Sequence, residues 1–190
     1  GFLMSVFILV LVLGIILIFY FRGNMKNLYK VAFVVIIIFG LCSVFITPLC
    51  DISDEYEHLT RSEIVSGGEI TADYVKNPEN NASGYKTIMT IKHVGDASDS
   101  NLFAHNLWDT DINYTDYYSP SAFAQNPFYA YLAPALGIIL AELLNLNSVW
   151  MLFLGRIANL ILYAVIVSIA IRKAPAFKFP LFIISIFPLA

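Results

Sequence analysis

A dense run of ionisable side chains follows directly on an apolar segment early in the chain. Residues 53–61 read SDEYEHLTR. A carboxylate can take the proton of an attacking hydroxyl, and imidazole or guanidinium groups can neutralise an anionic leaving group. On a helix, Asp54, His58 and Arg61 fall within about 60° of one another, at 100° per residue. The pattern indicates a polar stripe beside a membrane, although helix capping and a solvated flank also explain such acids.

The same stretch carries the signals of a short helix over residues 53–66. Asp51 or Ser53 can cap its start, acids fill the first turn, and a Gly-Gly pair follows its end. Further along, residues 86–94 (KTIMTIKHV) are rich in β-branched side chains and predict a short strand.

Arg156 is a second candidate, because it lies well inside another apolar segment, in LFLGRIANLI. A cation at that depth costs about 2.5–3.5 kcal/mol unless it is paired. Its long stem can reach toward the surface, either to a lipid phosphate or to a carboxylate of Asp54, Glu55 or Glu142. The residues alone leave both explanations open.

These groups must be positioned by membrane-spanning helices. The chain is 58% hydrophobic, which is too apolar for an ordinary soluble domain of 190 residues. Crossing a bilayer takes about 20 apolar residues. Segments of this kind lie at 1–22, 31–50 and 149–171, with the start of a further one at 179–190. We therefore expect an all-α polytopic membrane protein, of which this chain is a fragment.

Charge gives the orientation. The short loops at 23–30 and 172–178 carry lysine and arginine but no acidic residue, so the positive-inside rule places both in the cytoplasm. Residues 51–126 are then extracytoplasmic, and they hold thirteen acidic residues against four basic ones. The expected location is the plasma membrane, crossed several times.

The apolar segment at 127–147 does not fit this topology as a span. If it crossed, the loop at 172–178 would lie outside. It also contains Pro134 and Glu142. We expect a juxtamembrane helix in the outer interface, with Tyr129 and Tyr131 at headgroup level, and a true span is the alternative.

Asp109 and Asp111 form a DTD triplet, similar to the carboxylate pairs that hold metal in nucleotide-sugar enzymes. Those enzymes use cytoplasmic donors, so this is a secondary metal candidate. A divalent cation is the one cofactor that the sequence suggests.

Together these elements resemble a large bacterial family of multi-pass membrane proteins of unassigned function, usually grouped with the GT-C glycosyltransferases. That family shows Pro-Asp-Glu-x-x-His-x-x-Arg after an early span and Gly-Arg-x-x-Asn at the opening of a later helix. The resemblance covers about residues 31–190, and Ser53 stands where the family has proline. The matching positions are Asp54, Glu55, His58, Arg61, Gly155, Arg156 and Asn159.

The resemblance implies a GT-C-like fold whose extracytoplasmic first loop holds juxtamembrane helices and a short β element. It further implies sugar transfer from a polyprenyl-phosphate donor to a hydroxyl of a glycan, lipid or protein acceptor, at the outer membrane face. Asp54 is the expected base, and Glu55 would position the acceptor or a cation. The lipid phosphate would be bound by His58, Arg61, Arg156 and Asn159.

Two other function classes are open. The protein could bind or transport lipid-linked glycans without catalysis, or it could be a structural or sensor subunit with an acidic outer loop. The lipid bilayer is an expected partner in every case, and nucleic acid is not.

Overall fold

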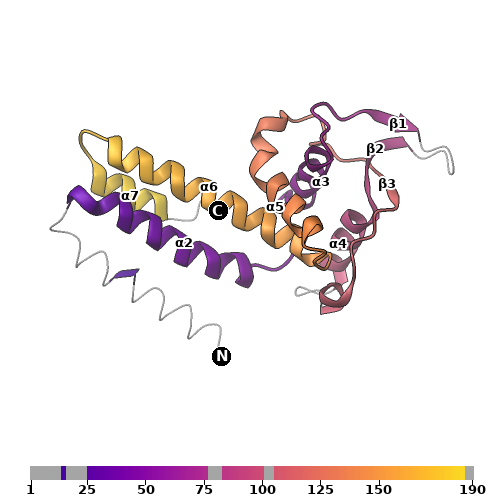
Figure 1. The fold of residues 1–190 in the computed structure, drawn as a ribbon, viewed down its shortest axis with the longest axis horizontal. Helices are drawn as coiled ribbons and strands as arrows, with labels where there is room; N and C mark the ends of the chain where they lie inside the picture. Colours follow the sequence, from indigo (N-terminus) through magenta and orange to yellow (C-terminus); the bar gives the residue numbers. More distant parts are fainter. Residues whose placement is uncertain (1–13, 16–24, 77–82, 101–104, 187–190) are drawn as a thin grey trace. The chain divides into compact units, whose positions relative to one another are not determined.

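A computed structural model describes residues 14–15, 25–76, 83–100 and 105–186, and the chain forms two compact units (Figure 1). One unit comprises residues 1–46 and 159–190, and the other comprises residues 47–158. The described part is mostly helical and includes a small sheet, in keeping with the expected helical class with a short β element.

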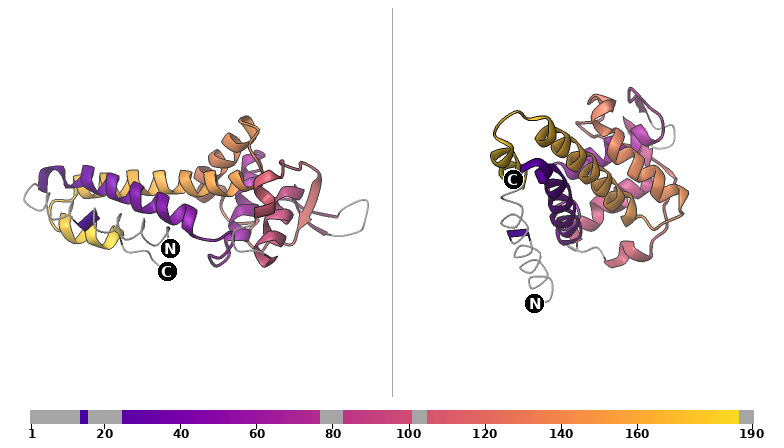
Figure 2. Two further views of the ribbon diagram at one scale, coloured as in Figure 1. Left: turned by 90° about the horizontal axis from the view of Figure 1, so that it is seen from below. Right: turned by 60° about the vertical axis from the view of Figure 1, so that its left-hand side comes forward.

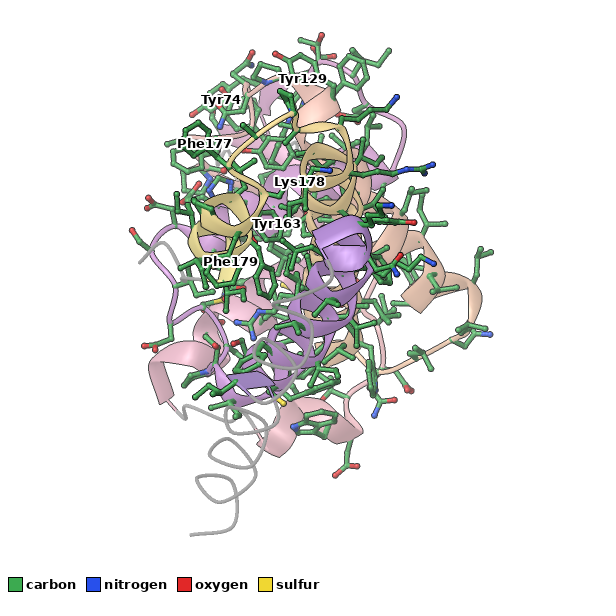
Figure 3. All side chains as sticks on the ribbon, turned by 90° about the vertical axis from the view of Figure 1, so that its left-hand side faces the viewer. Tyr74, Tyr129, Tyr163, Phe177, Lys178 and Phe179 are labelled. Carbon is green, nitrogen blue, oxygen red and sulfur yellow. The ribbon has the colours of Figure 1, made fainter. Side chains whose placement is uncertain are left out.

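The first unit contains α2 (Leu28–Ile46), the later part of α6 (Val149–Lys173) and α7 (Lys178–Ile186). Its core is formed by apolar side chains of all three helices: Leu28, Val31, Ala32, Val35, Ile171 and Phe182. Helices α2 and α6 run side by side in both views (Figures 1 and 2). Tyr163 of α6, labelled in Figure 3, donates a hydrogen bond to the Ser185 carbonyl at 3.0 Å.

Helices α2 and α6 are long and apolar enough to cross a bilayer, and they occupy two of the segments predicted as spans. Only 28% of either apolar stretch is buried within the protein, so both present most of their apolar surface outward. Helices with this much exposed apolar surface are suited to a lipid environment. The predicted span at 31–50 runs too far, because α2 ends at Ile46.

Two other predicted segments lie partly outside the described residues. The predicted span at 1–22 lies outside the described residues except for 14–15. In the segment at 179–190, α7 extends to Ile186 and residues 187–190 are not described.

The second unit holds the polar part of the chain. An antiparallel sheet of order β1-β2-β3 packs against helices α3 and α4, and α5 packs against α3. The helices are α3 (Glu55–Ser66), α4 (Met89–Ser100) and α5 (Leu132–Leu143), with 3-10 turns η2 (His105–Asp109) and η3 (Phe128–Tyr131). The strands are β1 (Tyr74–Lys76), β2 (Ser83–Ile88) and β3 (Asp116–Ser119).

The strand predicted over residues 86–94 was wrong in its second half. Strand β2 ends at Ile88, and Met89 begins α4. The side chains of Ile91 and Val94 are fully buried, and their spacing of three residues places them on one face of a helix, whereas in a strand they would point to opposite faces. Packing of this helical face overrides the β-branched composition.

Helix α5 approaches α6 closely. A Cβ atom added at Gly137 would lie 2.3 Å from the Leu154 carbonyl oxygen and 2.6 Å from the Gly155 amide nitrogen. Both neighbours are backbone atoms, which cannot move aside as a side chain can. Glycine at position 137 therefore sets the distance between the two helices.

Replacing this glycine should push the helices apart. We expect Gly137→Ala to destabilise the protein by about 1–3 kcal/mol through overpacking, despite alanine's higher helix propensity. Thermal unfolding in detergent micelles measures this. Gly67→Ala is the matched control, since its new Cβ would sit 3.5 Å from the Ile64 carbonyl oxygen, an ordinary contact. Equal melting temperatures for the two variants would contradict the close approach.

Candidate functional site

A buried ion pair joins α6 to the start of α3. Arg156 Nε donates to Glu55 Oε1 and Arg156 Nη2 donates to Glu55 Oε2, each at 2.6 Å. The two side chains are 9% and 11% exposed. This bidentate geometry is the strongest form of arginine–carboxylate contact. Of the partners considered for Arg156, the structure selects Glu55.

The loop between α2 and α3 wraps around this pair. Arg156 also donates from Nη1 to the Thr47 carbonyl at 2.9 Å and from Nη2 to the Pro48 carbonyl at 2.8 Å. The Cys50 amide donates to Glu55 Oε2 at 2.9 Å. Each charge is therefore compensated by its partner and by backbone dipoles, as a buried ion pair requires. Glu55 and Arg156 are positioned to hold the loop.

Asp54 is presented by that loop. It is exposed, and its backbone is left-handed, with φ 61° and ψ 12°. Asp54 is the N-cap residue of α3 but its side chain makes no capping hydrogen bond, so capping by Asp51 or Ser53 was also a wrong expectation. Ser53 Oγ donates to Asp54 Oδ2 at 3.3 Å. A non-glycine residue in this region is strained, and such strain concentrates at functional sites.

One turn along α3, His58 is exposed and its Nδ1 lies 3.0 Å from the Tyr131 hydroxyl. Asn126 Nδ2 donates to the same hydroxyl oxygen at 2.9 Å. The Tyr131 hydroxyl thus links Asn126 to His58, and which group donates in its contact with Nδ1 depends on the imidazole tautomer. The His58 ring also packs on Phe123, with centroids 4.9 Å apart. His58 is thus held in place by its contacts with Tyr131 and Phe123.

Arg61 has a different environment from the one predicted. Its side chain is 1% exposed, and it donates to three backbone carbonyls: Asn126 at 2.9 Å, Glu69 at 3.4 Å and Ile70 at 2.7 Å. Burial lowers the pKa of the guanidinium, while Tyr131 and Glu69 raise it. The predicted stripe is therefore split, because Asp54 and His58 reach solvent and Arg61 faces the interior. This arrangement favours a role for Arg61 in fixing loops over phosphate binding.

Asn159, Asp109 and Asp111 are the remaining predicted site residues. Asn159 is exposed and belongs to the other unit. The carbonyl of Asp111 accepts a hydrogen bond from Ser148 Oγ at 2.8 Å, so the DTD triplet is tied to the residues just before α6. Across the described ranges, no group of three or more His, Cys, Asp or Glu residues could hold a metal ion. The metal candidate at Asp109 and Asp111 gains no support.

Sequence reasoning missed the partners supplied by residues 121–131. Tyr131 was expected at headgroup level but is 6% exposed and faces His58. Glu57 Oε2 accepts hydrogen bonds from Ser121 Oγ and, at 2.9 Å, from the Ala122 amide. A buried tyrosine needs a hydrogen-bond partner for its hydroxyl. This rule could have indicated that Tyr131 faces a polar residue of another element.

Residues 36–190 match the family described as predicted membrane proteins, DUF2142. The chain belongs to this family. The matched region includes the whole of α6, the part of α2 from Ile36 onward and every residue of the site just described. Comparisons with curated proteins and with solved structures find no match.

Removing one partner of the buried pair should be costly. We expect Glu55→Gln to destabilise the protein by about 3–5 kcal/mol, because it leaves the Arg156 guanidinium buried without a counter-charge. Thermal unfolding in detergent measures the loss. Asp116→Asn is the control, since its ion pair with Lys86 is about half exposed on both sides and should matter little. Similar melting temperatures for both variants would contradict a structural role for the Glu55 charge.

Glu63 is a buried acid within the same helix. Its side chain accepts a hydrogen bond from Thr87 Oγ1. Burial raises the pKa of Glu63 to about 7; the Thr87 hydrogen bond lowers it, and the nearby charges of Glu142 and Glu69 raise it further. The folded protein therefore holds a proton on Glu63 at pH values where the unfolded chain, with a pKa of about 4.3, has lost it.

Stability should consequently fall as pH rises through this interval and level off above the folded pKa. Glu63→Gln removes the ionisable group, so its stability relative to wild type should increase with pH, by at most about 1.4 kcal/mol per pH unit. Melting temperatures between about pH 5 and pH 8 provide the measurement. Asp73→Asn, at an exposed position, should follow wild type. A difference between Glu63→Gln and wild type that stays constant with pH would contradict this titration.

Proposed function

We propose that the protein is a GT-C-type glycosyltransferase that moves a sugar from a polyprenyl-phosphate donor to an acceptor hydroxyl at the outer face of the plasma membrane. The observation that carries this proposal is the exposed, strained Asp54, held by a loop fixed through a buried ion pair. Its carboxylate is used neither as a helix cap nor in that ion pair. It is therefore available to a substrate.

In the proposed reaction, the acceptor oxygen forms a bond to the anomeric carbon of the sugar and its proton passes to the Asp54 carboxylate. The bond from the anomeric carbon to the phosphate oxygen breaks, and polyprenyl phosphate leaves with the electron pair. With a proton on Nε2, His58 can donate to the leaving oxygen, where negative charge develops.

The geometry changes the roles first expected for the other residues. Glu55 and Arg156 bind each other, and Arg61 binds backbone carbonyls, so in the proposal all three position the site. Asn159 remains a predicted lipid-phosphate ligand. The extracytoplasmic placement of residues 51–126 and the glycan, lipid or protein acceptor are part of the same proposal.

Replacement of Asp54 by asparagine tests the proposed base. Asparagine tolerates left-handed backbone geometry as well as aspartate does, so Asp54→Asn should keep the loop intact. We expect sugar transfer from polyprenyl-phosphate donors in membranes to fall by about 10²–10⁴-fold. The full-length protein should be used, with expression and melting temperature matched to wild type.

Asp51→Asn is the matched control, since Asp51 is an exposed acid of the same loop. It should retain transfer. Equal losses for Asp51→Asn and Asp54→Asn would indicate a general electrostatic effect and remove Asp54 as the base. A wild-type protein that binds these donors but transfers no sugar would favour a non-catalytic glycan-binding function.

A further inference from the structure

The first unit, residues 1–46 and 159–190, carries its described cations at one end and holds no acidic residue. All fourteen acids of the chain lie between positions 51 and 142, in the other unit. The described cations lie where α2 begins, where α6 ends and where α7 begins: Lys26, Lys30, Arg172, Lys173 and Lys178. These helix ends lie together (Figures 1 and 2), and Leu28 and Ile171 share a core cluster there. The positive charge is therefore not neutralised by any carboxylate of the unit.

Two of these cations share the ring of Tyr29. The Arg172 guanidinium carbon lies 5.5 Å from the ring centroid, and Lys30 Nζ lies 5.9 Å from it. Both distances fall within the range of cation–π contacts. Tyr29 is partly buried and packs against the core of the unit, so its ring is held in place. The ring therefore keeps a cation of α2 and a cation of α6 close together, although the two repel each other.

Helix polarity makes this arrangement unfavourable at α2. Arg172 lies in the last turn of α6, where the helix dipole favours a cation. Lys30 lies in the first turn of α2, which contains no acidic residue, and Lys26 lies in the 3-10 turn η1 (Met25–Asn27) just before it. At a helix N-terminus the dipole disfavours positive charge. An external anion would offset both the dipole and the clustered cations.

The surface next to the two cations is apolar. Val34 follows Lys30 by four residues and is exposed, and the exposed Ile169 precedes Arg172 by three. Residues at these spacings lie on the same face of a helix, one turn apart. Each cation therefore adjoins an apolar stripe that continues along its own helix. A ligand that matches both features has an anionic head and apolar chains.

We propose that Lys30 and Arg172, held on the ring of Tyr29, bind the phosphate of an anionic phospholipid whose acyl chains lie along the exposed apolar faces of α2 and α6. Arginine can bind two phosphate oxygens at once, lysine adds a point charge, and basic pockets between membrane helices bind anionic headgroups in this way. The positive-inside rule requires only the charges, whereas this site also requires the ring that holds two of them together. The inference rests on the first unit alone and is independent of the proposed sugar transfer.

Thermal stabilisation by added lipid tests the site, because a ligand that binds only the folded state raises the melting temperature. The full-length protein would be purified in uncharged detergent and titrated with phosphatidylglycerol. Phosphatidylcholine is the zwitterionic control, and glycerol 3-phosphate supplies a phosphate without acyl chains. Arg172→Gln removes the cation from the ring. Lys173→Gln is the matched control, since it removes one charge from the next, exposed position, about 100° around the same helix.

We expect wild type and Lys173→Gln to respond to phosphatidylglycerol at concentrations within about twofold of each other, whereas Arg172→Gln should need about tenfold more, as the loss of a charge-assisted hydrogen bond predicts. Tyr29→Leu, which keeps an apolar side chain at the core but removes the ring, should also need more lipid.

Three results would overturn the proposal. Equal losses for Arg172→Gln and Lys173→Gln would indicate non-specific attraction to a positive surface. Equal stabilisation of wild type by glycerol 3-phosphate would assign the site to a soluble phosphate compound. No stabilisation of wild type by phosphatidylglycerol beyond that by phosphatidylcholine would leave the cations without a lipid ligand.

Discussion

The arrangement of the site depends on how one cation inside an apolar helix is neutralised. Arg156 lies in the first third of α6, and there its charge must be compensated locally. Glu55 supplies the counter-charge, and the Thr47 and Pro48 carbonyls take further N–H groups. The loop that leaves α2 and the helix that follows are both fixed to α6 by this contact. Because Glu55 and Arg156 neutralise each other, the role of the pair is to fix the geometry of the loop between α2 and α3.

The imposed geometry explains the strain at the start of α3. Cys50 and Asp54 both have positive φ angles, of 54° and 61°, in the loop that surrounds the ion pair. Each such residue costs about 1–2 kcal/mol, which the loop would relieve if it were free to relax. The Cys50 amide instead donates to Glu55, which keeps the turn tight. As a result, the Asp54 side chain does not cap α3, and Asp54 is exposed to solvent.

Sequence alone located α3 to within two residues, because a run of acids precedes it and a glycine pair ends it. It also located α2 and α6, since long apolar runs have few alternatives. The sequence could not show which of Asp54, Glu55 and Glu142 pairs with Arg156, because the course of the loop between α2 and α3 decides this. Periodicity placed Arg61 beside His58 but could not show which loops cover Arg61. Composition likewise could not reveal that Tyr131 faces inward, since apolar helices near membranes commonly expose tyrosine.

Helix α5 links the chemistry of α3 to the membrane because its two faces have opposite requirements. Its leucines favour lipid, whereas the Tyr131 hydroxyl just before them requires polar partners and finds them in His58 and Asn126. Under the proposed function, both requirements would be met near the boundary between hydrocarbon and water, where a substrate with a polar head and an apolar tail also lies. The same constraint explains why the small residues of α5 matter, since they hold the helix close enough for Tyr131 to reach His58.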